Sequence, residues 1–241
     1  MAQLPLPTLY VEGPDDTVFI SNLLHRHGID TQRGREHLEI KHLGSVEKVL
    51  DAIPDAVRNA SNRPVGFVVD IDIVTQHRWG AIRHRLVNLG LNEAIPHHCP
   101  NNGYLGRIVD YPFEFGVWLM PDCQTDGQKL EDLIVTLLPE QHPLWQHAQT
   151  STDKAAQLFD AAVVADSSVG LRWSRFSDGD RLKAQLRTWL AWQKQPGMGY
   201  GAAVNDKILN SDSPQALAFM DWMRRLFQFP ISGTASPGGP T

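Results

Sequence analysis

The stretch VGFVVDID, residues 65–72, joins a nearly continuous run of apolar, largely β-branched residues to two aspartates at its end. Strands that are apolar on both faces are typical of parallel sheets covered by helices on both sides. Working outward from this stretch, the apolar runs at residues 6–11, 38–43 and 115–122 predict three further strands. The chain is therefore expected to build its core around a parallel sheet.

Helix-type spacing of apolar residues fills the intervals between these strands. It predicts helices at 15–28, 45–57, 77–89 and 129–139, with Pro54 disturbing the second of them. The alternation of strand and helix predicts an α/β fold, a doubly wound (Rossmann-like) parallel sheet flanked by helices with right-handed crossovers.

The sequence pattern changes after Pro139, where four segments with helix-type spacing of apolar residues follow one another. We predict an α/β core over residues 1–139, a helical C-terminal extension over 140–230 packed on that core, and a disordered Gly, Pro and Ser-rich tail over 231–241. The segment GMGYG, 197–201, is interpreted as a loop. Five tryptophans of the extension are expected to pack rather than to stack on bases: Trp145, Trp173, Trp189, Trp192 and Trp222.

Composition limits the classes of function. With 42% hydrophobic and 20% charged residues, the chain is typical of a globular protein, and no leader or long apolar run predicts secretion or a membrane span. A cytoplasmic location with Cys99 and Cys123 as reduced thiols is expected. The net charge of −5 argues against a surface that binds nucleic acid all over, so a polyanion would need a local patch or a metal.

Acidic residues follow three of the predicted strands: Glu12 the first, Asp70 and Asp72 the third, and Asp122 the fourth. In a parallel open sheet these strand ends share the ligand-binding rim. An extended backbone would turn the side chains of Asp70 and Asp72 to the same face of the strand. Asp16 lies four residues after Glu12, so both could face the same point if a helix begins near Pro14. Clustered carboxylates repel one another, and Mg²⁺ or Mn²⁺ would neutralise them. The alternative is that the individual acids cap helices.

Three short motifs carry a family resemblance. Glu12-Gly13 after the first strand, Gly44 opening the second helix, and Asp70-Ile71-Asp72 after the third strand resemble the TOPRIM domain of topoisomerases, primases and overcoming-lysogenization-defect (OLD) nucleases. Downstream, the stretches FGVWLMPDCQTDGQKLEDLI (115–134) and TWLAWQKQPGMGYG (188–201) resemble an uncharacterised bacterial TOPRIM-like family of unassigned activity.

The resemblance implies roles for individual residues. Glu12 would be a metal ligand or general acid/base, and Asp70 and Asp72 would hold Mg²⁺. Asp16 matches a further acid of the OLD-type nucleases, and Lys183 is the candidate for their late lysine. Neither the tyrosine context of a topoisomerase nor the zinc module of a primase is visible, which argues against both activities.

The leading interpretation is a metal-dependent (Mg²⁺ or Mn²⁺) nuclease, a phosphodiester hydrolase acting on DNA or RNA. Arg78, Arg83 and Arg85, on the helix after the DID sequence, are either phosphate contacts or a solvated face. The alternatives are a catalytically silent regulatory module that binds metal and nucleic acid, and a receiver-like phosphoacceptor domain. The ATP-binding motif GxxxxGK[ST] is absent, so an ATPase that drives this protein would have to be a separate polypeptide. A second copy of the chain, forming a homodimer, is the other candidate protein partner.

Overall fold

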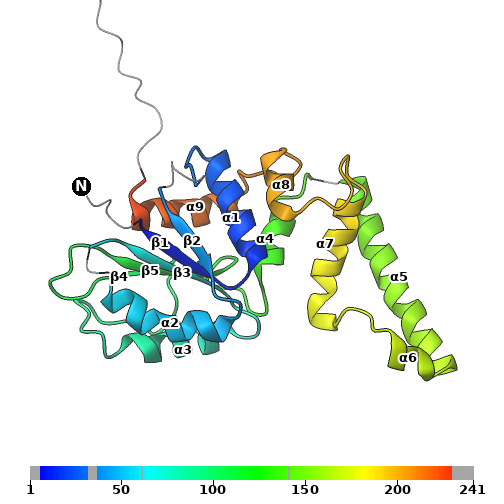
Figure 1. Ribbon diagram of the computed structural model, residues 1–241, viewed down its shortest axis with the longest axis horizontal. Helices are drawn as coiled ribbons and strands as arrows, with labels where there is room; N and C mark the ends of the chain where they lie inside the picture. Colours follow the sequence, from blue (N-terminus) through cyan, green and yellow to red (C-terminus); the bar gives the residue numbers. More distant parts are fainter. Residues whose placement is uncertain (1–5, 32–36, 61, 141, 230–241) are drawn as a thin grey trace, which may run out of the picture.

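The protein is built around a five-stranded sheet with the order β2-β1-β3-β5-β4 (Figure 1). The computed structural model describes residues 6–31, 37–60, 62–140 and 142–229. The first four strands in this order are parallel, which confirms the predicted α/β class, and the fifth is antiparallel. The strands are β1 (Thr8–Val11), β2 (Glu39–His42), β3 (Val65–Asp70), β4 (Tyr104–Gly106) and β5 (Phe115–Met120).

Helices cover both faces of the sheet. Figure 1 shows α1 (Pro14–Arg26) and α9 (Pro214–Phe227) on one face, and α2 (Val46–Arg58) and α3 (Thr75–Leu86) on the other. The two central strands, β3 and β5, lie between these layers, and every residue of β5 is buried. Their apolar character on both faces follows from this position.

Several predicted boundaries differ from the structure, including those of α2, α3 and β3. Pro54 lies inside α2, which continues to Arg58 because its apolar face stays buried against the core. Helix α3 runs over 75–86 rather than 77–89. Strand β3 ends at Asp70, two residues earlier than predicted. The short antiparallel strand β4 was not predicted, because its three residues carry too little pattern.

The C-terminal half contributes both to the core and to a projecting arm. Helix α8 (Tyr200–Asn205) packs on α1, and α9 packs on β3 and β5. We call residues 143–191 the helical arm, which stands away from the sheet in Figure 1. The remaining elements are α4 (Leu130–Thr136), α5 (Pro143–Ala165), α6 (Ser168–Arg172), the 3₁₀ turn η1 (Asp178–Asp180) and α7 (Arg181–Ala191).

Two interpretations of the C-terminal half change in part. The predicted loop 197–201 is wrong in its last two residues, which begin α8. Trp189 and Trp222 are fully buried as expected, whereas Trp173 and Trp192 are 61% and 40% exposed, and Trp192 stacks on His147 with ring centroids 5.1 Å apart. The predicted tail over 231–241 lies outside the described residues.

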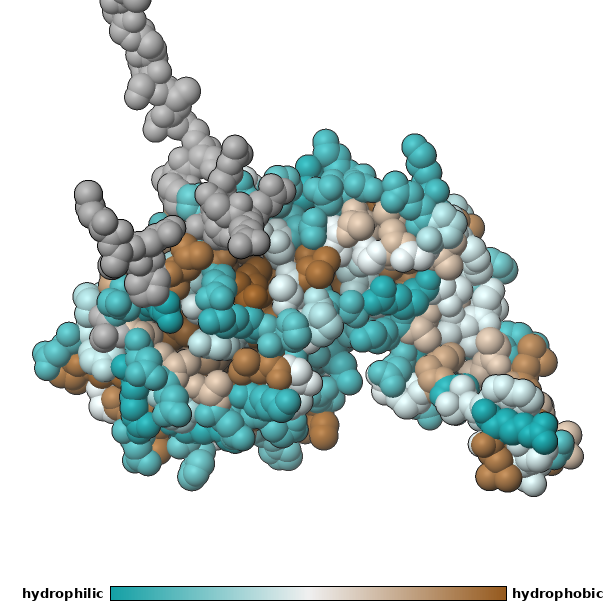
Figure 2. Space-filling view, in the orientation of Figure 1, coloured by the Kyte–Doolittle hydropathy of each residue, from teal (hydrophilic) through white to brown (hydrophobic). Residues whose placement is uncertain are grey.

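The surface of the protein is mixed in character. Figure 2 shows hydrophilic and hydrophobic residues interspersed over the α/β core, and brown, hydrophobic residues also at the far end of the helical arm. The exposed side chains of that region include Val164 and Leu171, each 88% exposed. Both cysteines are free and buried. Among the described residues, no helix combines the length and the apolar character that crossing a membrane requires.

Candidate active-site cleft

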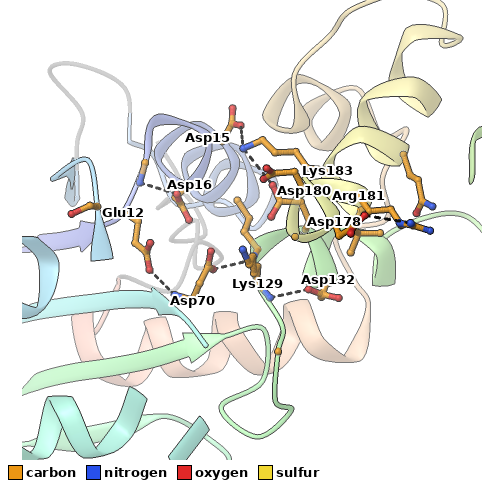
Figure 3. Close-up of a pocket in the computed structure, with 18 of the residues that line it drawn as sticks. Glu12, Asp15, Asp16, Asp70, Lys129, Asp132, Asp178, Asp180, Arg181 and Lys183 are labelled. Atoms are coloured by element: carbon orange, nitrogen blue, oxygen red, sulfur yellow. Dashed lines mark hydrogen bonds and ion pairs between the residues drawn. The ribbon is translucent and has the colours of Figure 1, made fainter. Parts of the chain in front are cut away.

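A cleft of about 480 Å³ opens at the C-terminal ends of β1 and β3 (Figure 3). One wall comes from the core: the turns after β1, β2 and β3, and the segment that enters α4. The opposite wall comes from η1 and the first turn of α7, so the base of the helical arm closes one side. This is the rim where parallel open sheets bind their ligands.

Glu12 and Asp70 lie together at this rim although they are 58 residues apart. The Oε1 atom of Glu12 accepts a hydrogen bond of 2.8 Å from the backbone N–H of Asp70. One carboxylate oxygen of Asp70 in turn accepts a 3.0 Å hydrogen bond from the backbone N–H of Leu130. The two acids therefore occupy the same side of the sheet and the same cleft.

Asp16 serves both as a helix cap and as a cleft residue. Its Oδ2 atom accepts a 2.9 Å hydrogen bond from the backbone N–H of Gly13, which closes the first turn of α1. The side chain also lines the cleft. The capping alternative and the site interpretation thus both apply to Asp16.

The buried position of these acids makes their ionised forms costly. Burial raises the pKa of Glu12 to about 7, and the neighbouring charges of Asp16 and Asp72 add to the effect. Burial likewise raises the pKa of Asp16 to about 6. The pKa of Asp70 is raised well above its usual range by burial and by the charge of Glu12. Such a cluster favours protons or a bound cation as neutralising partners.

Asp72 does not share the extended geometry of Asp70. The strand ends at Asp70, and Asp72 has a φ of 62°, so the prediction that both side chains point to one face of a strand is wrong. The Asp72 carboxylate forms ion pairs with Arg78 Nη2 at 2.6 Å and with Lys129 Nζ at 3.1 Å. Asp72 is not among the residues that line the cleft.

Asp122 closes a turn of its own after β5. Its Oδ1 atom accepts hydrogen bonds of 2.9 Å from the backbone N–H groups of Gln124 and Thr125, and its Oδ2 atom accepts one of 2.7 Å from the Thr125 hydroxyl. Both oxygens are therefore used locally, and the residue does not line the cleft. The structure does not support its predicted role as a metal ligand at the common rim.

The three arginines of α3 separate from one another. Arg78 lies at the rim, where its Nε donates a 2.9 Å hydrogen bond to the backbone oxygen of Asp70. Arg83 and Arg85 belong to the last turn of α3, and Arg85 pairs with Asp51 of α2 at 2.7 Å. Of the three arginines, Arg78 alone therefore lies at this rim, because the helix carries Arg83 and Arg85 away from it at about 1.5 Å per residue.

Lys183 lies in the cleft, on the first turn of α7. Its Nζ atom is 3.5 Å from Asp15 Oδ2 and 3.6 Å from Glu131 Oε1, so it joins the arm to α1 and α4. Lys129 and Glu131, which also line the cleft, were missed by sequence reasoning. They belonged to a predicted amphipathic helix, where polar residues are ordinarily solvated, and no local pattern indicated that this segment packs against the end of β3.

Comparison with known proteins places the chain in a family. The model of a protein family of unknown function, DUF3226, matches residues 7–228. The chain belongs to this family. The match of this DUF3226 chain runs from the start of β1 to the end of α9, so it includes both walls of the cleft. No curated protein and no solved structure matches the chain.

The donor chemistry of the cleft fits a hard divalent cation in part. Among the described residues, no group of three or more His, Cys, Asp or Glu side chains is already arranged to hold a metal ion. Within the same residues, however, the second carboxylate oxygens of Glu12 and Asp70 accept no hydrogen bond. Glu12, Asp70 and the adjacent Asp16 supply the oxygen ligands that Mg²⁺ and Mn²⁺ prefer. Asp72 is not part of this set, because its carboxylate pairs with Arg78 and Lys129 and does not line the cleft.

Proposed function

We propose that this protein is a metal-dependent phosphodiester hydrolase that acts on DNA or RNA, with the cleft at the ends of β1 and β3 as its active site. The observation that carries the proposal is the meeting of Glu12 and Asp70, whose 2.8 Å hydrogen bond holds two buried acids in one cleft. A TOPRIM-type site is expected to have acidic residues at the strand ends of a parallel sheet. Glu12 and Asp70, with Asp16 beside them, match that expectation, and the TOPRIM assignment is part of this proposal.

Glu12 and Asp70 would hold the divalent cation, with Asp16 beside them. A bound Mg²⁺ or Mn²⁺ supplies the positive charge that neutralises the acids and stabilises charge on the phosphate. Without metal, burial raises the pKa of Glu12 to about 7, so a cation bound at the free oxygen of Glu12 would take the place of a proton there. The hydrogen bond to the Asp70 backbone orients the Glu12 carboxylate for this role.

The cationic residues of the cleft would hold the substrate's phosphates. Lys183 and Arg181 come from the arm and Lys129 from the core, so a strand that enters the cleft would meet positive charge on two sides. These residues take the place of Arg83 and Arg85 in the proposal. The lining as a whole is nevertheless acidic, with eight carboxylates against three cations, so a bound metal ion would have to supply the remaining attraction for a polyanion.

The experiment is a cleavage assay with single-stranded and nicked DNA and with RNA at low salt. We expect cleavage that requires Mn²⁺ or Mg²⁺ and that disappears in Glu12→Gln and Asp70→Asn. Asp122→Asn is the matched control, because this acid follows the neighbouring strand yet serves only its own turn. Cleavage that persists in EDTA, or in both cleft variants, would contradict the proposal.

A catalytically silent regulatory module is the second candidate. It is favoured by the ion pairs of Asp72 with Arg78 and Lys129, which neutralise one acid of the DID sequence internally. Binding of Mn²⁺ and of nucleic acid without cleavage of any tested substrate would select this candidate. A separate ATPase partner, a homodimer and a cytoplasmic location stay predictions.

A further inference from the structure

The segment that enters α4 holds the end of β3 through three consecutive residues. The backbone oxygen of Gln128 accepts a 3.1 Å hydrogen bond from the backbone N–H of Asp72. Lys129 Nζ lies 3.1 Å from the Asp72 carboxylate, and the backbone N–H of Leu130 donates to the carboxylate of Asp70. Two of these contacts involve backbone atoms, so only the ammonium group of Lys129 can leave without unfolding the turn.

The two cations on Asp72 differ in how firmly they are held. The Arg78 side chain is 16% exposed, and it also donates to the backbone oxygen of Asp70, so two hydrogen bonds fix it. The Lys129 side chain is 35% exposed, and in the described part of the chain its ammonium group forms one ion pair, with Asp72. A lysine on a flexible stem loses little when it changes partner. Arg78 is a fixed counter-ion, and Lys129 is the mobile one.

Lys129 also lines the cleft, whereas Asp72 does not. Lys129 therefore connects the Asp72 carboxylate with the wall of the cleft next to Asp70. A divalent cation held by Asp70 would repel the ammonium group of Lys129, since like charges a few ångströms apart are only partly screened at a protein surface.

We propose that Lys129 is an exchangeable counter-ion: it neutralises Asp72 while the cleft is free of metal, and a divalent cation displaces it from that carboxylate. The inference rests on the metal site proposed above. The Lys129–Asp72 pair places a positive charge beside the cleft in the metal-free protein and lowers its apparent affinity for the metal, because each binding event must first break this pair.

The test is calorimetric titration of the full chain with Mn²⁺ at one pH and at low salt. Lys129→Met should bind Mn²⁺ roughly three- to tenfold more tightly than the parent, the range of a partly exposed ion pair. Lys129→Arg, which keeps the charge, should stay near the parent value. Lys183→Met is the matched control, because it removes a lysine of the same cleft that contacts Asp15 and Glu131 instead. It should change the affinity less.

A double-mutant cycle separates exchange at Asp72 from a general effect of charge. In the Asp72→Asn background the gain from Lys129→Met should vanish, because the pair to be broken is already absent. An equal gain in both backgrounds would overturn the exchange. Thermal unfolding of each variant without metal verifies that it is folded.

The remaining outcomes also decide between the two proposals. Unchanged affinity in Lys129→Met, with a parent that binds Mn²⁺, would overturn the exchange and leave the metal site standing. Binding in Lys129→Met but not in the parent would support the exchange in its strongest form. No Mn²⁺ binding in the parent or in any variant would overturn the metal site and the exchange together.

Discussion

The side chain of Glu12 is tied to the backbone of Asp70 by a 2.8 Å hydrogen bond that joins the ends of two neighbouring strands. Because the donor is a backbone N–H at the end of β3, the position of Glu12 is set by the sheet itself and not by a mobile loop. Asp70 is held in turn by the backbone N–H of Leu130. The fold thus holds both acids in position before any ligand arrives, an arrangement expected of sites that must be preorganised.

The buried charge of Glu12 predicts a pH-dependent cost to stability. Burial raises its pKa from 4.5 to about 7, so the folded state binds the proton more tightly than the unfolded state does. The proton on Glu12 therefore stabilises the folded state. This contribution to the free energy of unfolding is complete below about pH 4.5 and is lost as the pH rises through about 7. Without metal, Glu12→Gln should therefore exceed the parent in free energy of unfolding by about 1–3 kcal/mol above pH 7, and by less near pH 5.

Chemical denaturation at several pH values, with EDTA present, measures this difference. Glu47→Gln, at an exposed position of α2, is the control and should follow the parent at every pH. A Glu12→Gln advantage that does not grow as the pH rises from 5 to above 7 would contradict the account.

Arg78 and Arg85 lie on the same helix and should behave differently. Arg78→Ala removes a charge-assisted hydrogen bond to Asp72 and a hydrogen bond to the backbone of Asp70, so we expect a loss of about 2 kcal/mol in stability. Mn²⁺ should bind more tightly, because a cation beside Asp70 is lost. Arg85 pairs with Asp51, which is 71% exposed, so Arg85→Ala should cost less than about 1 kcal/mol and leave Mn²⁺ affinity unchanged. Equal effects of the two substitutions on Mn²⁺ binding would be inconsistent with this geometry.

Two helical glycines give opposite predictions for the same substitution. A Cβ atom at Gly80 in α3 would meet nothing within 4 Å, so Gly80→Ala should stabilise the protein by about 0.5–1 kcal/mol through helix propensity. At Gly201 in α8 a Cβ atom would lie 2.6 Å from the backbone oxygen of Val18, so Gly201→Ala should destabilise by about 1–3 kcal/mol. Thermal unfolding of both variants tests whether α8 packs this closely on α1.

The helical arm is joined to the core through Arg187. This side chain donates a 2.7 Å hydrogen bond to Asp15 at the start of α1, and its guanidinium lies 4.4 Å from the ring centre of Tyr200. Arg187→Leu should therefore raise amide hydrogen exchange along α7 more than along α1. Arg181→Leu is the control, because Arg181 pairs with Asp153 and Asp178 within the arm. Unchanged exchange in Arg187→Leu would show that other contacts hold the arm.

The layout of the core follows from local patterns. The apolar runs that predicted strands at 65–72 and 115–122 are the two central strands, where burial on both faces demands such residues. Glu12 and Asp70 could be assigned to one rim because parallel strands end on the same side of a sheet.

The details of the site depend on contacts that are distant in sequence. Asp72 leaves the strand because its backbone N–H bonds to Gln128, and a left-handed φ at a non-glycine residue is held by such surroundings. Lys129 enters the cleft only because its segment packs against the end of β3. Neither contact leaves a periodic signal in the sequence, so the shape of the DID turn and its counter-ion could not be predicted.

The central claim is that a divalent cation binds between Glu12 and Asp70. Anomalous diffraction from a crystal soaked in Mn²⁺ tests it most directly. We predict a manganese peak in the cleft at about 2.1 Å from carboxylate oxygens of both acids, and no such peak in Asp70→Asn crystals treated in the same way. Manganese bound only elsewhere on the protein, or in the cleft without contact to Glu12 and Asp70, would contradict the account.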